Sequence, residues 1–326
     1  MIRDYLKAAI FAVSCLLGSL AHADINLSVR VTDMNNLPVN GAKVIADFQG
    51  YLKKHQVTVT EATNADGIAI ITGCSKAGPV NTTINITVNG EGYYYSTVEA
   101  ISGKNLKHDV HVMLRKRVNP AALYVKRVSI GVPIDEGWVA FDFEKGDLVK
   151  PYGEGKVSDL FLKTKSVRTE DNGSIPIDSD AGKLLIKFPS EHDGIIFQDA
   201  GYNIKSDMVM PHEAPADGYQ GIYTREEAAY FDANRRKDCG VFMRVRSVSN
   251  EKGELKTANY AKLNEDLRFD PRESGWHVND EGKPKTFGNV SFTYYFNPTP
   301  DDRNLEFDPE RNLFKDLKAD QRVYKP

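Results

Sequence analysis

Two carboxylates lie close to aromatic residues in one short stretch of the sequence. Asp142 and Glu144 are two residues apart, and Trp138 and Tyr152 flank them. Carboxylates beside aromatic side chains suit sugar binding, or glycoside hydrolysis in which an acid and a base flank the bond that breaks. The pair also alternates with two phenylalanines, which favours a simpler interpretation: the polar, solvent-exposed face of a strand. We therefore predict a binding role for Trp138, Asp142, Glu144 and Tyr152 and assign no catalytic residue.

The end of the chain carries a second group of candidate binding residues. The triplet Arg-Asn-Leu begins at Arg303 and again at Arg311, and Phe307 and Phe314 follow closely. In a docking tail, the phenylalanines would anchor a partner and the arginines would clamp it. Alternatively, the segment is an irregular arm that folds back and caps the sandwich, since its apolar content argues against free disorder. Truncation before Asp301 separates the two interpretations.

The cysteines allow one intramolecular disulfide. Cys15 belongs to the N-terminal export segment, so Cys74 and Cys239 remain in the mature chain. Both lie at the ends of predicted strands, and an oxidising compartment permits a bond between them. Two unrelated buried thiols are an equally good interpretation.

The sequence indicates neither a metal nor a cofactor. His108 and His111 are three apart on a predicted strand, so their side chains point to opposite faces. Asp178 and Asp180 alternate before a glycine, but the later ligands of a calcium loop are missing, and a solvated turn explains both. Serine hydrolase elbows, zinc-protease helices and phosphate-binding loops are absent from the sequence.

Residues 1–23 read as a signal peptide. Arg3 and Lys7 precede an apolar stretch over 8–20, and small residues stand at the -3 and -1 positions before a cut after Ala23. The apolar stretch is too short to span a bilayer, so we predict cleavage rather than anchoring. We expect a periplasmic or secreted protein with no transmembrane segment in the mature chain.

Composition and charge exclude several classes of protein. The 326 residues carry 42 basic and 45 acidic side chains, for a net charge of -3. Such a balance argues against a nucleic-acid partner, which usually requires clustered positive charge. Hydrophobic residues make up 41% of the chain, so the chain can bury sizeable cores. The length fits about two domains.

Alternation with a period of two dominates the mature chain. Apolar residues alternate with polar ones over 25–31, and turn signals such as Asn64–Gly67 separate several similar segments up to residue 114. We predict about seven short strands in this part, arranged as an antiparallel sandwich. Residues 139–143, 241–248 and 290–296 continue the alternation, so the second part is also β-rich.

Residues 24–115 resemble the transthyretin-like, carboxypeptidase-regulatory-like β-sandwich. The resemblance rests on Val29–Asp33, Leu37–Val44, Thr63–Gly67 and the Gly92-Tyr93 step. It implies a non-catalytic accessory module that contributes no active-site residues. The His-x-x-Glu pair of the carboxypeptidase domain that can accompany this module is absent from the sequence.

The remainder resembles a region of uncharacterised secreted bacterial proteins over 141–155, 213–220 and 294–314, which implies no activity. One short helix is predicted at Thr224–Arg236, where Thr224 and Glu227 form a capping box. The sequence thus predicts an all-β protein of two sandwich-like domains, 24–117 and 118–326, with one helix in the second.

The functional hypothesis is a non-catalytic protein of the cell envelope that binds a protein or a glycan. Two alternatives stay open: a glycan-acting hydrolase that uses carboxylates of the second domain, and a structural component of envelope assembly.

Overall fold

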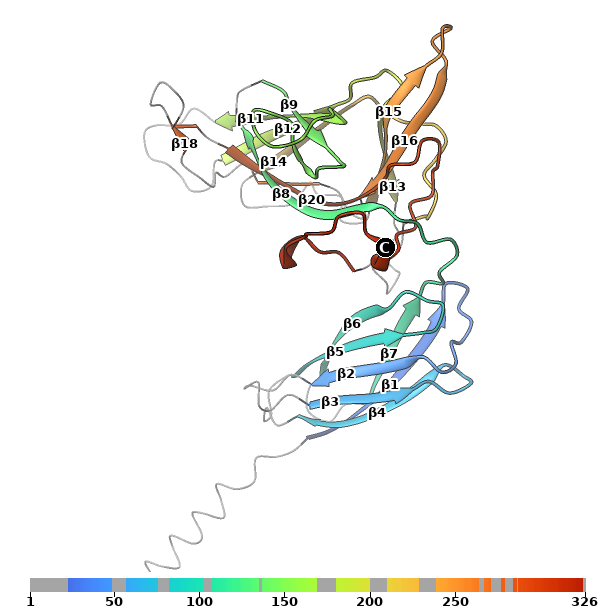
Figure 1. Ribbon diagram of the computed structural model, residues 1–326. Helices are drawn as coiled ribbons and strands as arrows, with labels where there is room; N and C mark the ends of the chain where they lie inside the picture. The colour runs from blue at the N-terminus through green and yellow to red at the C-terminus, as the bar shows by residue number, and fades with distance from the viewer. Residues whose placement is uncertain are drawn as a thin grey trace, which may run out of the picture. The chain divides into compact units, whose positions relative to one another are not determined.

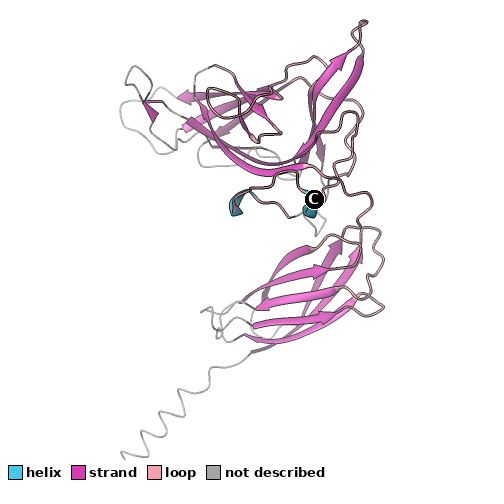
Figure 2. Cartoon of the chain, in the orientation of Figure 1, coloured by secondary structure: helices cyan, strands magenta, loops and turns pink. Residues whose placement is uncertain are grey.

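The protein forms two compact units that divide between Arg117 and Val118 (Figure 1). The computed structural model describes residues 23–48, 57–75, 82–102, 107–134, 137–168, 180–199, 210–228, 239–263, 267–270, 277–278, 284–285 and 287–324. Residues 1–22 of the predicted signal peptide lie outside the described residues. Strands make up almost all of the regular structure, so the prediction of an all-β protein is confirmed (Figure 2).

Unit 1, which ends at Arg117, is built from two sheets. Its strands are β1 (Ala23–Asp33), β2 (Lys43–Phe48), β3 (Val57–Ala62), β4 (Ile68–Ser75), β5 (Thr82–Asn89), β6 (Ser96–Ser102) and β7 (Lys107–Leu114). One sheet has the order β4-β1-β7 and the other has the order β3-β2-β5-β6. Pairing is antiparallel except between β1 and β7, which run parallel.

The core of unit 1 follows directly from the alternating sequence. Leu27, Val29 and Val31 of β1 are fully buried, whereas the side chains between them point away from the core. They join apolar side chains from both sheets in one cluster. A period of two therefore places every second residue of each strand between the sheets.

A glycine turn fixes the approach of two strands in unit 1. Gly67 has a φ of 72° and its amide donates to the carbonyl of Asn64. A Cβ atom at this position would lie 2.4 Å from the carbonyl oxygen of Val31, whose own amide donates to the Gly67 carbonyl. The turn predicted at Asn64–Gly67 is thus present, and only glycine fits its close contact.

Unit 2 also contains two main sheets. Its strands are β8 (Tyr124–Pro133), β9 (Val139–Asp142), β10 (Asp147–Leu148), β11 (Leu160–Arg168), β12 (Asp180–Lys187), β13 (Gly194–Asp199), β14 (Ile222–Ala228), β15 (Cys239–Ser249), β16 (Leu255–Leu263), β17 (Arg268–Asp270), β18 (His277–Val278), β19 (Pro284–Lys285) and β20 (Phe287–Asn297). One sheet has the order β10-β9-β11-β12-β14, and the other the order β13-β15-β16-β20-β17, with β8 paired to β20.

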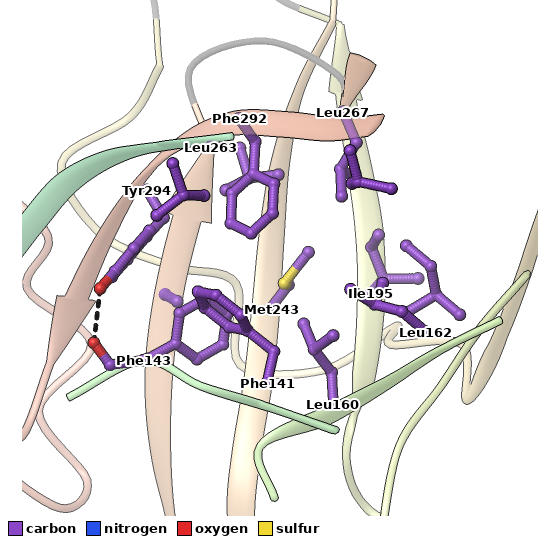
Figure 3. Packing of buried hydrophobic residues seen from close by; sticks show 14 of the residues in the cluster. Phe141, Phe143, Leu160, Leu162, Ile195, Met243, Leu263, Leu267, Phe292 and Tyr294 are labelled. Atoms are coloured by element: carbon purple, nitrogen blue, oxygen red, sulfur yellow. Dashed lines mark hydrogen bonds between the residues drawn. The ribbon is translucent and has the colours of Figure 1, made fainter. Parts of the chain in front are cut away.

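The main core of unit 2 lies between these two sheets. Phe141 of β9 packs edge-on against Phe292 and Tyr294 of β20, with ring centroids 5.4 and 5.9 Å apart. The buried hydroxyl of Tyr294 donates to the carbonyl of Phe143 at 2.6 Å (Figure 3). Aromatic rings therefore fill the space between the sheets, and the buried hydroxyl of Tyr294 has a hydrogen-bond partner there.

The C-terminal segment packs along β8. The amide of Leu313 donates to the carbonyl of Leu123, and the side chain of Asn312 bonds both the amide and the carbonyl of Val125. Two short 3-10 turns, η3 (Pro309–Arg311) and η4 (Ala319–Gln321), interrupt this segment. The C-terminal segment therefore covers backbone groups of β8 that would otherwise be exposed at the edge of the sheet.

The helix predicted at Thr224–Arg236 is wrong where the structure describes it. Residues 222–228 form strand β14, which pairs with β12 from Ile222 to Ala228. A full antiparallel ladder outweighs the local capping box of Thr224 and Glu227, because tertiary pairing overrides local propensity. Residues 229–236 lie outside the described residues, as do the side chains of Cys74 and Cys239, so the disulfide stays a prediction.

Candidate functional site

The outward face of the β9-β11-β12-β14 sheet carries lysines and apolar side chains together. Side chains alternate along each strand, so the partners of the buried residues point outward. We call this surface the lysine face; it comprises Trp138, Phe161, Lys163, Lys165, Lys183, Leu185, Lys187 and Ile222. The inward partners, such as Leu160, Leu162, Leu184 and Ile186, are fully buried in the core.

An aromatic pair holds one lysine at one end of the lysine face. The Nζ atom of Lys187 lies 4.5 Å from the ring centroid of Trp138 and 5.3 Å from that of Phe161. Phe161 and Lys187 are direct neighbours across β11 and β12. Cation–π contacts at exposed sites contribute about 0.5–1 kcal/mol each, so they orient Lys187 without removing its charge.

Lysines gather at the other end of the same face. Lys165 of β11 stands directly opposite Lys183 of β12, and Lys163 is one outward position away. The neighbour of Lys183 on β14 is Glu226. Neither Lys163 nor Lys165 forms an ion pair with another described residue. Like charges placed directly opposite each other, as at Lys165 and Lys183, are unfavourable in a sheet by themselves.

The apolar members of the lysine face are not part of a described core. Ile222 is 70% exposed, and Trp138, Phe161 and Leu185 are half-buried. None of them belongs to the packed clusters formed by the described residues. Apolar surface beside charges on a sheet face is typical of a binding surface.

Asp142 is buried, which contradicts its interpretation as part of a solvent-exposed strand face. Its side chain is 2% exposed. One carboxylate oxygen accepts the amides of Glu144 and Lys145, at 2.9 and 3.2 Å. The other accepts the amides of Lys156 and Val157, at 2.8 and 3.0 Å. A buried carboxylate needs such donors, and here they fold two loops around it.

Arg246 of β15 ties three carboxylates together. Its Nε and Nη2 atoms donate to the two carboxylate oxygens of Asp159 at 2.6 and 3.0 Å. It also donates to Glu144, and its Nη2 lies 3.6 Å from Asp142. The guanidinium lies 4.9 Å from the ring centroid of Phe296. We call Arg246 with Asp142, Glu144 and Asp159 the Arg246 cluster.

Burial sets the electrostatics of the Arg246 cluster. It raises the pKa of Asp159, although the hydrogen bond and charge of Arg246 and the amide of Phe143 act in the opposite direction. Burial also disfavours the Arg246 cation, but Asp159 and Glu144 outweigh this and raise the pKa of Arg246 above its ordinary value. Arg246 therefore stays charged, and it compensates carboxylates that the fold has removed from water.

A bulge in β15 directs Arg246 into this cluster. Its φ is 56°, and the pairing register of β15 with β16 shifts between Val245 and Val248. A bulge re-aims the side chain of a strand residue, and a positive φ is uncommon for arginine. The local backbone strain thus serves the ion-pair geometry.

The structure separates Trp138 from Asp142, two of the predicted sugar-binding residues. Trp138 immediately precedes β9 and Asp142 ends it, so they lie about 13 Å apart at the usual rise of a strand. Tyr152 is exposed on the loop that follows β10. The oxygens of Asp142 accept backbone amides and Glu144 pairs with Arg246, so neither carboxylate is held as the free acid or base that hydrolysis requires.

The C-terminal candidates make contacts within unit 2. Phe307 is fully buried, with its ring centroid 5.8 Å from that of Tyr295. Phe314 packs edge-on against Tyr124 at 5.0 Å. Arg303 pairs with Glu213. Arg311 pairs with Asp308 at 2.7 Å and donates to the carbonyl of Pro120. The arm therefore folds back onto the sandwich, and Phe307 has no exposed surface to offer a partner.

The lysines and Phe161 were not predicted as site residues. Their signal is present in the sequence, since Phe161, Lys163 and Lys165 alternate strictly with apolar and small residues. Arg246 and Asp159 left no comparable signal, because they meet across 87 positions of the chain. Only the folded sheets bring them together.

Among the described residues, no group of three His, Cys, Asp or Glu side chains is placed to hold a metal ion. Within the same residues, no helix is long and apolar enough to cross a membrane.

Comparisons with known proteins do not assign the chain to a family. No protein-family model matches the chain, and no curated protein matches it. A search of solved structures returned the apo HmuY analog of Tannerella forsythia, at 13% identity and a TM-score of 0.23. The match covers 56% of this chain and all of that one. A TM-score of this size carries no argument about fold or function.

Proposed function

We propose that the protein is an exported, non-catalytic binding protein of the cell envelope. The observation that supports this most directly is the lysine face, where Trp138, Phe161 and Lys187 stand together beside further lysines. The proposed partner is a glycan or a protein. Export is part of the proposal and rests on the signal-peptide pattern of residues 1–23.

The Arg246 cluster supports binding over hydrolysis. A glycosidase needs one carboxyl group that donates a proton and a second that attacks or activates water. Asp142 instead accepts four backbone amides, and Glu144 pairs with a permanently charged arginine. These carboxylates organise loops, so we place the ligand on the lysine face rather than between them.

Unit 1 is proposed as an accessory module of the transthyretin-like type. Its seven strands in two sheets are compatible with that family, and the resemblance rests on turn and packing residues such as Asp33 and Gly67. Asp33 accepts the amides of Asn35 and Leu37 at 2.8 and 2.9 Å, which closes the turn after β1. Such a module would support the binding unit without adding chemistry.

A glycan array with product analysis tests the proposed function. The chain from Asp24 onward is applied to the array and, in parallel, is used to pull down partners from an envelope extract. Each bound glycan is then incubated with the protein and weighed by mass spectrometry. Binding with unchanged ligand mass is the expected result. Shorter products would establish a hydrolase instead, and the absence of any bound glycan or envelope protein would refute the binding role.

A further inference from the structure

We propose that the ligand of the lysine face is a linear glycan that carries carboxylate groups, as uronic acid polymers do. The inference rests on the proposed binding function and names the chemistry of its ligand. It places the polymer along the outward residues of β11 and β12, with sugar rings toward Trp138 and carboxylates toward Lys163 and Lys165.

The positive charge of the lysine face is local. Four of its members are lysines, while the chain as a whole is acidic, with a net charge of -3. Outward residues on one strand repeat at about 6.6–6.8 Å, and neighbouring strands lie about 4.8 Å apart. On β11 and β12 the face therefore presents regularly spaced cations, with Glu226 of β14 as the acidic neighbour of Lys183, and this spacing complements a polymer with regularly repeated negative charges.

The type of cation favours single carboxylates. Among the described outward side chains of this sheet there is no arginine, so the face lacks the planar fork that binds a carboxylate or a phosphate through two bonds and offers single contacts instead. Lysine acts as a compact point charge with freely rotating donors. Lys163 and Lys165 form no ion pair with another described residue, which leaves their charges available to a ligand.

The aromatic end of the face favours a sugar over a nucleic acid. The Nζ atom of Lys187 lies over the Trp138 ring, 4.5 Å from its centroid, and 5.3 Å from the ring centroid of Phe161. Nucleic-acid platforms stack several bases on open aromatic rings. Here the two aromatic rings share one ammonium group, which suits a single sugar ring with hydroxyl groups that accept hydrogen bonds.

The variant Lys163→Glu/Lys165→Glu tests the inference. Replacing Lys165 by glutamate places opposite charges at the cross-strand pair with Lys183, so the sheet should fold at least as well as in the wild type. The matched control is Lys252→Glu/Lys256→Glu, which changes the net charge equally but lies at the exposed β15–β16 hairpin.

The measurement is affinity electrophoresis of the chain from Asp24 onward in gels that contain polygalacturonate or alginate, with neutral dextran and single-stranded DNA as comparisons. The wild type and the control variant should be retarded equally by at least one uronate polymer. The Lys163→Glu/Lys165→Glu variant should bind that polymer about tenfold more weakly, since like charges then face each other.

Four results would overturn the inference. The first two are an equal loss of uronate binding in both variants, and unchanged uronate binding by the Lys163→Glu/Lys165→Glu variant. The other two are tighter binding of dextran or DNA than of either uronate polymer, and no retardation of the wild type by either uronate polymer. If another glycan is bound on the array, or an envelope protein is recovered in the pull-down, only the carboxylate inference fails. If no ligand is bound in either experiment, the proposed function fails as well.

Discussion

Arg246 of β15 and Asp159, which immediately precedes β11, form a two-point ion pair between the two sheets of unit 2. Nε and Nη2 of the arginine donate to separate oxygens of the carboxylate, at 2.6 and 3.0 Å. Asp159 also accepts the amide of Phe143 at 2.7 Å. One side chain thereby joins the strand that bears the bulge to the loops that surround the main core.

Removal of this arginine should destabilise unit 2 strongly. Arg246→Met leaves Asp142 and Asp159 buried without their cation, and we expect a loss of about 3–5 kcal/mol in the free energy of unfolding. Urea denaturation measures this loss. The control Arg127→Met changes an exposed arginine of β8 and should cost less than about 0.5 kcal/mol. Equal stability of the two variants would contradict a structural role for the cluster.

Acidification should favour the fold through Asp193. Its carboxylate is 2% exposed and accepts the amides of Ser247 and Ser190 at 2.9 and 3.3 Å. Burial raises the pKa of Asp193 above its ordinary value, and these hydrogen bonds only partly oppose the rise. A carboxylate with a raised pKa in the folded state binds its proton more tightly there. Its contribution to stability is thus present at low pH and is lost as pH rises through that pKa.

The variant Asp193→Asn isolates this titration. Asparagine does not titrate, so the melting temperature of the variant minus that of the wild type should increase as pH rises above the ordinary pKa of aspartate, about 3.9. Thermal melts followed by circular dichroism give this difference at each pH. A difference that stays constant, or that decreases toward neutral pH, would show that burial does not control Asp193.

A comparison of Gly41 and Gly67 in unit 1 distinguishes the cost of backbone strain from the cost of a steric clash, because both residues have the same φ. Gly41 and Gly67 both have a φ of 72°, but a Cβ atom at Gly41 meets nothing within 4 Å, whereas at Gly67 it meets the Val31 carbonyl. Gly41→Ala should cost about 1–2 kcal/mol, which is the backbone term alone. Gly67→Ala should cost at least about 1 kcal/mol more. Denaturant unfolding of the two variants makes the comparison, and equal costs would mean that the Gly67 turn relaxes freely.

The C-terminal arm should contribute to the stability of unit 2. Phe307→Ala removes a fully buried ring, and we expect a loss of about 3–5 kcal/mol. Tyr324→Ala is the control on the same arm, because that side chain is 56% exposed and should contribute less than about 0.5 kcal/mol. Differential scanning calorimetry compares them. If the melting temperature of Phe307→Ala equals that of the wild type, the arm does not cap the sandwich.

The regular parts of the fold could be predicted from residue patterns. Leu27, Val29 and Val31 alternate with polar residues because every second side chain of a half-buried strand faces the core, and the structure buries all three. Local chemistry also located the hairpin at Asn250–Gly253, where the amide of Asn250 donates to the carbonyl of Glu254. Both features depend on neighbours in the sequence.

The features that could not be predicted depend on distant partners. The capping box at Thr224 is a local signal, but the ladder with β12 forms across the fold and outweighs it. Asp142 has the sequence context of an exposed residue, and the loop amides and Arg246 that allow its burial are recognisable only in the folded chain. Among the candidate residues, only Trp138 belongs to the lysine face.

The emission of Trp138 during a polygalacturonate titration tests the central claim most directly. The chain contains two tryptophans, so Trp276→Phe leaves Trp138 as the single reporter. We predict a saturable change in its fluorescence that disappears when Lys163 and Lys165 are also replaced by glutamate. If ultrafiltration shows that the polymer is bound while the emission of Trp138 stays constant, the ligand does not occupy the lysine face.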